Sequence, residues 1–191
     1  MQNRLEKLFW GGFALLWGWI VLNSVFRWEH NGPAAFAVGA ALAAGLCSVG
    51  ADVIDLGVVP TPAVAYLVMK YKADAGVMIS ASHNPYPFNG IKIFGSRGYK
   101  LSDEQEEQIE HYIDNPPAEA MATGAELGRI THLELSAEVE YTNHIIKSAP
   151  GRIEGMRVIL DCANGAASQT AERIFSALGA DVTLIHHSPN G

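Results

Sequence analysis

The sequence predicts an α/β fold in which helices cover a mostly parallel β-sheet. Two short runs rich in β-branched residues, 52–59 and 76–80, flank a helical segment, and this strand–helix–strand order is typical of parallel sheets. The same order returns at 156–185. Of 191 residues, 49% are hydrophobic and 17% are charged, which is enough apolar material for a packed core. We therefore expect a globular α/β chain.

Helix caps, prolines and glycines divide the chain into its expected elements. Thr61 and Pro62 are suited to the N-cap and first position of a helix. Ser102 and Gln105 have the spacing of a capping box, and Asn115-Pro116-Pro117 would end the helix that they open. The expected helices are 34–49, 63–71, 103–114, 136–148 and 166–178, and the expected strands are 52–59, 76–80, 91–94, 156–162 and 181–185, with a surface loop at 118–131.

Residues 149–151 (Ala-Pro-Gly) predict a domain boundary, because a new strand–helix–strand unit starts directly after them. We divide the chain into an atypical hydrophobic segment at 1–33, a partial first domain at 34–150 and the start of a second domain at 151–191. A lone unit of this kind has two open strand edges and an uncovered apolar face. We therefore expect the chain to be truncated at its C-terminal end.

Residues 8–26 form an uncharged apolar run that would span about 28 Å as a helix, which matches a bilayer core. Tryptophans lie in or beside the run, and Arg4 and Lys7 precede it, as expected near a membrane interface. Three explanations stay open. The run is a membrane helix, a buried hydrophobic helix, or a start that lies outside the normal reading frame of the gene.

The charge of the chain excludes one class of partner. The net charge is −7, with 13 lysines and arginines against 20 aspartates and glutamates. Proteins that bind nucleic acid cluster basic residues against the phosphate backbone. We therefore expect no nucleic-acid partner.

The stretch from Gly76 to Lys92 is the expected functional centre. A buried-looking strand stops there at small hydroxyl residues and turns, so it would display Ser82 at a carboxyl end. His83 would point away from Ser82 in extended chain, which disfavours a hydrolase triad. A phosphorylated serine needs only positioning and charge compensation, and Lys92 could supply the cation or the acid–base group. The alternative is that the polar residues only satisfy the backbone of a loop.

The run Ile79-Ser80-Ala81-Ser82-His83-Asn84-Pro85, followed by Asn89-Gly90-Ile91-Lys92, resembles the phosphoserine loop of the α-D-phosphohexomutase family. The segments 59–65, 98–102 and 161–166 add to this resemblance, which extends over 41–191 and is greatest to its bacterial phosphoglucosamine mutase branch. It implies a three-layer α/β/α domain I of phosphohexomutase type, here incomplete, plus the first βαβ unit of domain II.

The resemblance also implies a function. Ser82 would carry the phosphoryl group and bind Mg²⁺ through its phosphate, and His83 and Lys92 would be active-site residues. The reaction would interconvert glucosamine 6-phosphate and glucosamine 1-phosphate through a bisphosphate, so the partner would be a hexosamine phosphate and the location cytoplasmic.

Two departures from the family pattern limit these expectations. The opening glycine-rich and arginine-containing motifs are absent, and the later metal, sugar-binding and phosphate-binding loops do not occur in this sequence. The first hypothesis is thus an inactive fragment of a cytoplasmic mutase. The second is a non-catalytic, mutase-like binding or interaction module, tethered to a membrane by residues 8–26.

Overall fold

The computed structural model describes residues 19–24, 32–82, 84, 88–115 and 121–188. Five strands form the main sheet, in the order β4-β3-β1-β2-β5. Strands β1, β2, β3 and β5 are parallel, and β4 is antiparallel to β3. The carboxyl ends of four strands therefore lie at one edge. The bounds are β1 Trp19–Ser24, β2 Asp52–Asp55, β3 Ala75–Ser80, β4 Gly90–Gly95 and β5 Ile130–His132.

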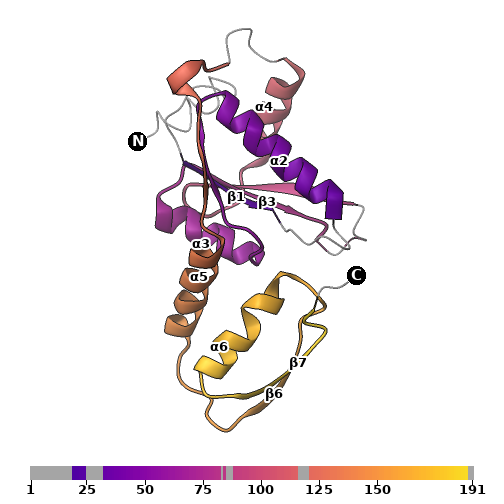
Figure 1. Cartoon of the computed structure of the whole chain (residues 1–191), viewed down its shortest axis with the longest axis vertical. Coiled ribbons are helices and arrows are strands. Elements are labelled where there is room, and N and C mark those ends of the chain that lie inside the picture. Colours follow the sequence, from indigo (N-terminus) through magenta and orange to yellow (C-terminus); the bar gives the residue numbers. More distant parts are fainter. Residues whose placement is uncertain (1–18, 25–31, 83, 85–87, 116–120, 189–191) are drawn as a thin grey trace.

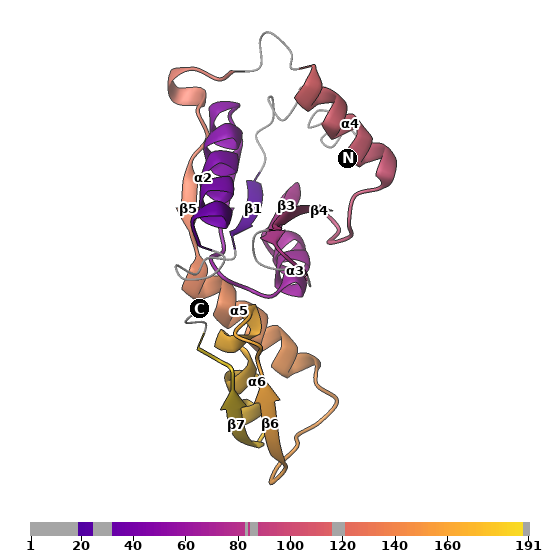
Figure 2. The same cartoon turned by 90° about the vertical axis from the view of Figure 1, so that its right-hand side faces the viewer.

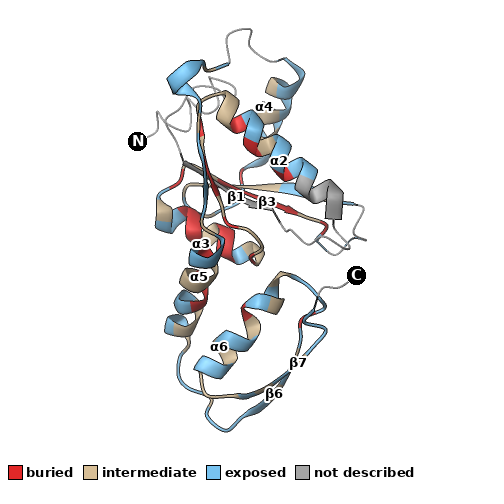
Figure 3. Ribbon diagram, in the orientation of Figure 1, coloured by how far each residue is buried: buried red, intermediate tan, exposed pale blue. Residues whose placement is uncertain are grey.

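Helices cover both faces of this sheet. Figure 1 shows α2 and α3 on opposite sides of β1 and β3, and α5 continues below α3. Successive residues of β3 alternate between the two cores: Val77 and Ile79 pack with α2, whereas Met78 packs with α3 and α5. The buried residues accordingly lie between helix and sheet (Figure 3). The helices are α2 Gly32–Ser48, α3 Thr61–Tyr71, α4 Asp103–Asp114 and α5 Glu134–Ser148.

A second, two-stranded sheet follows α5. Its parallel strands are β6 Arg157–Asp161 and β7 Asp181–Ile185, joined by the short helices η2 Ala166–Gln169 and α6 Ala171–Ala177. Figure 2 shows β6 and β7 side by side with α6, below the main sheet. The expected strand–helix–strand unit is confirmed, although its helix is divided in two. The domain division at residue 150 stays a prediction.

The N-terminal run does not form the helix that its composition suggested. Residues Trp19–Ser24 are strand β1, which lies between β2 and β3 and pairs with both. A membrane helix over 8–26 is therefore wrong for this part of the run, while 8–18, 25 and 26 lie outside the described residues. Within the described ranges, every helix is too short or too polar to cross a bilayer. The structure thus gives no support to the membrane-tethered hypothesis.

Three local expectations are corrected by backbone contacts. Strand β2 ends at Asp55, not at residue 59, because the Asp55 carboxylate accepts a hydrogen bond from the Gly57 amide (2.9 Å) and Gly57 adopts φ +63°. Helix α3 starts after Pro60, without the side-chain cap expected from Thr61. The loop expected at 118–131 contains a 3₁₀ turn, η1 Gly124–Glu126, and ends in β5. The Ser102–Gln105 capping box is confirmed.

Candidate active site

Ser82 lies in a turn two residues beyond the carboxyl end of β3. Its side chain is exposed, and its backbone adopts φ +57°, a left-handed conformation that few residues other than glycine adopt. The Asn84 amide donates a hydrogen bond to the Ala81 carbonyl (2.9 Å), which closes the turn around Ser82. Strained backbone of this kind is concentrated at functional sites, because the surrounding fold must maintain it. The structure therefore displays Ser82 at the edge where ligands of parallel sheets bind.

Lys92 lies on the neighbouring strand. In the antiparallel register of β3 and β4, it is opposite Met78, and Ser80 is opposite Gly90. Paired residues point to the same face, so the half-buried Lys92 side chain lies on the α3 side of the sheet, together with Phe94. Ser82 is four residues beyond Met78, which corresponds to at most about 13 Å of extended chain. The structure thus places Lys92 and Ser82 on adjacent segments near one edge.

His83 lies outside the described residues. Its expected role in positioning or proton transfer stays a prediction, as do the roles of Ser82 and Lys92.

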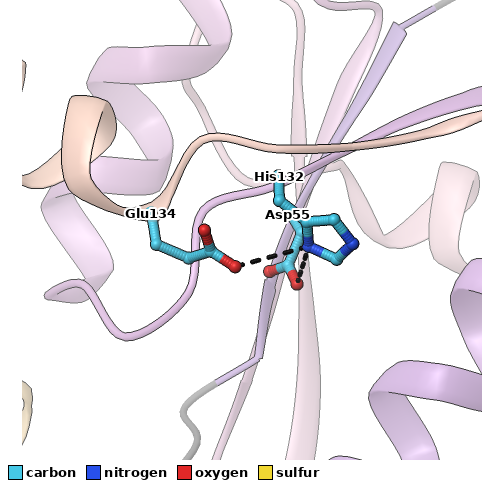
Figure 4. Close-up of side chains that lie close together, drawn as sticks. All are labelled: Asp55, His132 and Glu134. Atoms are coloured by element: carbon cyan, nitrogen blue, oxygen red, sulfur yellow. Dashed lines mark ion pairs between the residues drawn. The ribbon is translucent and has the colours of Figure 1, made fainter.

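A second group of polar side chains, Asp55, His132 and Glu134, lies at the same edge of the sheet (Figure 4). Nδ1 of His132 is 3.3 Å from Oδ2 of Asp55 and 3.3 Å from Oε1 of Glu134. Sequence reasoning missed this group because it did not expect strand β5, which ends at His132. The only sequence signal was that His132 follows the β-branched pair Ile130-Thr131.

A further histidine–carboxylate pair lies at the carboxyl ends of β6 and β7. Oδ1 of Asp161 accepts a hydrogen bond from the Ala163 amide (2.9 Å) and lies 3.0 Å from Nδ1 of His186. The charged carboxylate is stabilised first by the Ala163 amide and then by His186. Both contacts lower the pKa of Asp161 below its usual value. Ala163, Asn164 and His186 all have positive φ, so the loops at this end are also strained.

The described residues provide only part of a Mg²⁺ site. Mg²⁺ prefers about six oxygen ligands, often from carboxylates and phosphates. The exposed Ser82 hydroxyl suits one ligand position through a phosphate. The Asp55, His132 and Glu134 group offers an imidazole nitrogen, and in the strand order it is separated from β3 by β1. It therefore does not complete a magnesium shell around Ser82.

Comparison with known proteins agrees with this architecture. A phosphoglucosamine mutase of Acetivibrio thermocellus is 54% identical over 153 residues, or 80% of this chain and 34% of the relative. The phosphoglucosamine mutase of Clostridium beijerinckii is 53% identical over 152 residues, or 79% of this chain and 34% of the relative. This chain thus spans about a third of the length of these relatives.

Among solved structures, a phosphoglucomutase/phosphomannomutase family protein of Burkholderia thailandensis superposes with a TM-score of 0.70 and 23% identity. The superposition covers 91% of this chain and 37% of that protein. Residues 34–119 match the family model described as phosphoglucomutase/phosphomannomutase, alpha/beta/alpha domain I. That match includes β2, α3, β3, the Ser82 turn, β4 and α4. Residues 34–119 therefore form a domain I of the phosphoglucomutase/phosphomannomutase family, and about four fifths of the chain is similar to phosphoglucosamine mutases.

Proposed function

We propose that this chain supplies the phosphoserine loop of a phosphoglucosamine mutase, which interconverts glucosamine 6-phosphate and glucosamine 1-phosphate in the cytoplasm. The observation that carries the proposal is the position of Ser82, exposed in a left-handed turn at the carboxyl end of β3. The identity of about one half to phosphoglucosamine mutases supports the choice of sugar.

In the proposed reaction, the phosphoryl group leaves Oγ of phosphorylated Ser82 and bonds to the free hydroxyl oxygen of the sugar monophosphate. The hydroxyl proton is lost to a nearby base, and Ser82 regains a proton as the P–O bond to its oxygen breaks. The resulting bisphosphate reorients and returns its other phosphoryl group to Ser82. Lys92 and His83 are the candidate groups for positioning and proton transfer. Mg²⁺, bound through the serine phosphate, would offset the charge on the phosphoryl oxygens.

The direct test is phosphoryl transfer to Ser82 from labelled glucosamine 1,6-bisphosphate in a full-length enzyme that carries this sequence. Ser82→Ala and Ser82→Gly should both abolish the label and the turnover. Glycine adopts the φ of +57° without strain, so the second variant separates loss of the hydroxyl from a change in the turn. Ser102→Ala, in the cap of α4, is the matched control and should remain active. Full activity of either Ser82 variant would refute the assignment.

Residues 1–191 alone should not catalyse steady turnover. Ser82 supplies one of the several oxygen ligands that Mg²⁺ requires, and a single ligand does not hold this cation tightly. The measurement is the conversion of glucosamine 6-phosphate by the purified chain at saturating Mg²⁺. Sustained interconversion that disappears with Ser82→Ala would show that the chain contains a complete site and would overturn this expectation.

A further inference from the structure

We propose that Asp55, His132 and Glu134 bind one divalent transition-metal ion of the Zn²⁺ class at the carboxyl edge of the main sheet. This site is distinct from the Ser82 loop, and the inference does not depend on the proposed mutase activity.

Three separate segments bring the ligands together. Asp55 is the last residue of β2, His132 is the last residue of β5, and Glu134 is the first residue of α5. Asp55 and His132 are direct partners in the parallel register of β2 and β5. An ion at this point would therefore connect the end of one strand to the junction between the next strand and its helix (Figure 4).

The distances fit a tetrahedral ion. Zinc binds nitrogen and oxygen ligands at about 2.0–2.2 Å, so two ligand atoms of a tetrahedral site are separated by about 3.3–3.6 Å. Both carboxylate oxygens lie 3.3 Å from Nδ1 of His132, and the three candidate ligand atoms all lie within 4.8 Å of one another. A small movement of the two oxygens would complete a face of the tetrahedron. The fourth position can be filled by water, because the side chains of His132 and Glu134 are 63% and 49% exposed.

The aspartate is already oriented as a ligand. Its Oδ1 accepts the Gly57 amide at 2.9 Å, which leaves Oδ2 for His132. Such hydrogen bonds to a ligating carboxylate are a regular feature of metal sites. Gly57 also leaves space for Glu134, because a Cβ at residue 57 would lie 2.5 Å from Cγ of Glu134. Two features of the β2–α3 loop thus position two of the three ligands.

The charges favour a dication over a simple ion pair. One ring nitrogen, Nδ1, faces both carboxylates and can present a single proton between them. Among the described residues, no lysine or arginine forms an ion pair with Asp55 or Glu134. A divalent ion would bond to the neutral imidazole and offset both negative charges. The imidazole selects a transition metal over Mg²⁺.

The site is separate from the proposed phosphoryl site. Asp55 ends β2 and Ser82 follows β3, and β1 lies between these strands, so about 10 Å of sheet separates them. Lys92 shares the α3 face with Met78, whereas Asp55 alternates with Ile54 of that core and is on the other face. The metal would therefore stabilise the sheet edge and would not touch the transferred phosphoryl group.

The experiment is a calorimetric titration of the full chain, residues 1–191, with Zn²⁺ in the presence of excess Mg²⁺. The wild type should bind one more equivalent than His132→Ala. Glu134→Gln keeps the size of the side chain and should lower the affinity for this additional Zn²⁺ ion by at least about tenfold. Tenfold is the smallest effect usually seen when a contact that only supports a metal ligand is lost. His186→Ala is the matched control, because among the described residues His186 forms an ion pair with Asp161 and with neither Asp55 nor Glu134, so this variant should still bind the additional Zn²⁺ equivalent.

Circular dichroism of each variant, without metal, checks that the fold is retained. If His132→Ala fails to fold, Glu134→Gln decides, because Glu134 lies at an exposed helix start. Equal stoichiometry and affinity in the wild type and the decisive variant would overturn the proposal. So would loss of the equivalent in His186→Ala, or displacement of Zn²⁺ by the excess Mg²⁺.

Discussion

Replacing Gly128 with alanine should displace β5 from the main sheet. A Cβ at residue 128 would lie 1.9 Å from the carbonyl oxygen of Ala51, so the two backbone segments must separate by more than about 1 Å. The Gly128 amide donates to the Cys47 carbonyl (2.9 Å), and the next amide, of Arg129, donates to Asp52 (2.9 Å). Overpacking costs about 1–3 kcal/mol, and each weakened hydrogen bond costs about 1 kcal/mol more. We expect a loss of about 3–5 kcal/mol from overpacking and the two weakened hydrogen bonds together.

The assay is urea unfolding of residues 1–191, followed by far-ultraviolet circular dichroism, with the free energies of unfolding compared by linear extrapolation. Gly45→Ala is the matched control, because the added Cβ would meet no atom within 4 Å beyond the adjacent residues and backbone of its own helix, α2. That control should stabilise the chain by about 0.5–1 kcal/mol. If Gly128→Ala changes the free energy of unfolding by less than about 0.5 kcal/mol, the close approach of residues 51 and 128 is not a constraint and the docking of β5 is wrong.

Three further predictions concern stability. Leu67 is fully buried between α3 and the sheet, so Leu67→Ala should lower the free energy of unfolding by about 2–5 kcal/mol. Met69 is half exposed on the same helix, so Met69→Ala should lower it far less. Similar losses in the two variants would contradict the assigned core. Ser102→Ala removes the cap of α4 and should cost about 1 kcal/mol, seen as faster hydrogen exchange in the first turn of α4; unchanged exchange would contradict the capping box. The lowered pKa of Asp161 means that its charged form stabilises the fold above the unfolded pKa, and that this contribution disappears as the pH falls through the lower folded pKa. Urea unfolding of the wild type and Asp161→Asn from pH 7 to pH 2 should therefore show a difference in stability that shrinks in acid. A difference that stays constant would refute the stabilising role of the charged Asp161 carboxylate.

Local signals in the sequence were sufficient for most elements. The capping box at Ser102 marked the start of α4, and the β-branched runs at 52–59 and 76–80 marked β2 and β3, although β2 ends earlier, at Asp55. These patterns depend on residues close in sequence, whose spacing already encodes caps, alternation and breakers. The two strands that sequence reasoning missed lack such signals. Strand β1 lies within a long apolar run that also suits a helix, and β5 has three exposed residues and no alternation.

The sequence alone determined the family resemblance, the position of the Ser82 turn after a buried strand, and the net negative charge, from which no nucleic-acid partner is expected. Those features depend on short contiguous motifs and on composition. Only the tertiary structure decided that residues 19–24 pair between β2 and β3, that Lys92 faces α3, and that Asp55, His132 and Glu134 converge. Each of these depends on strand order and register between segments up to about 80 residues apart, and spacing along the chain does not specify which strands become neighbours.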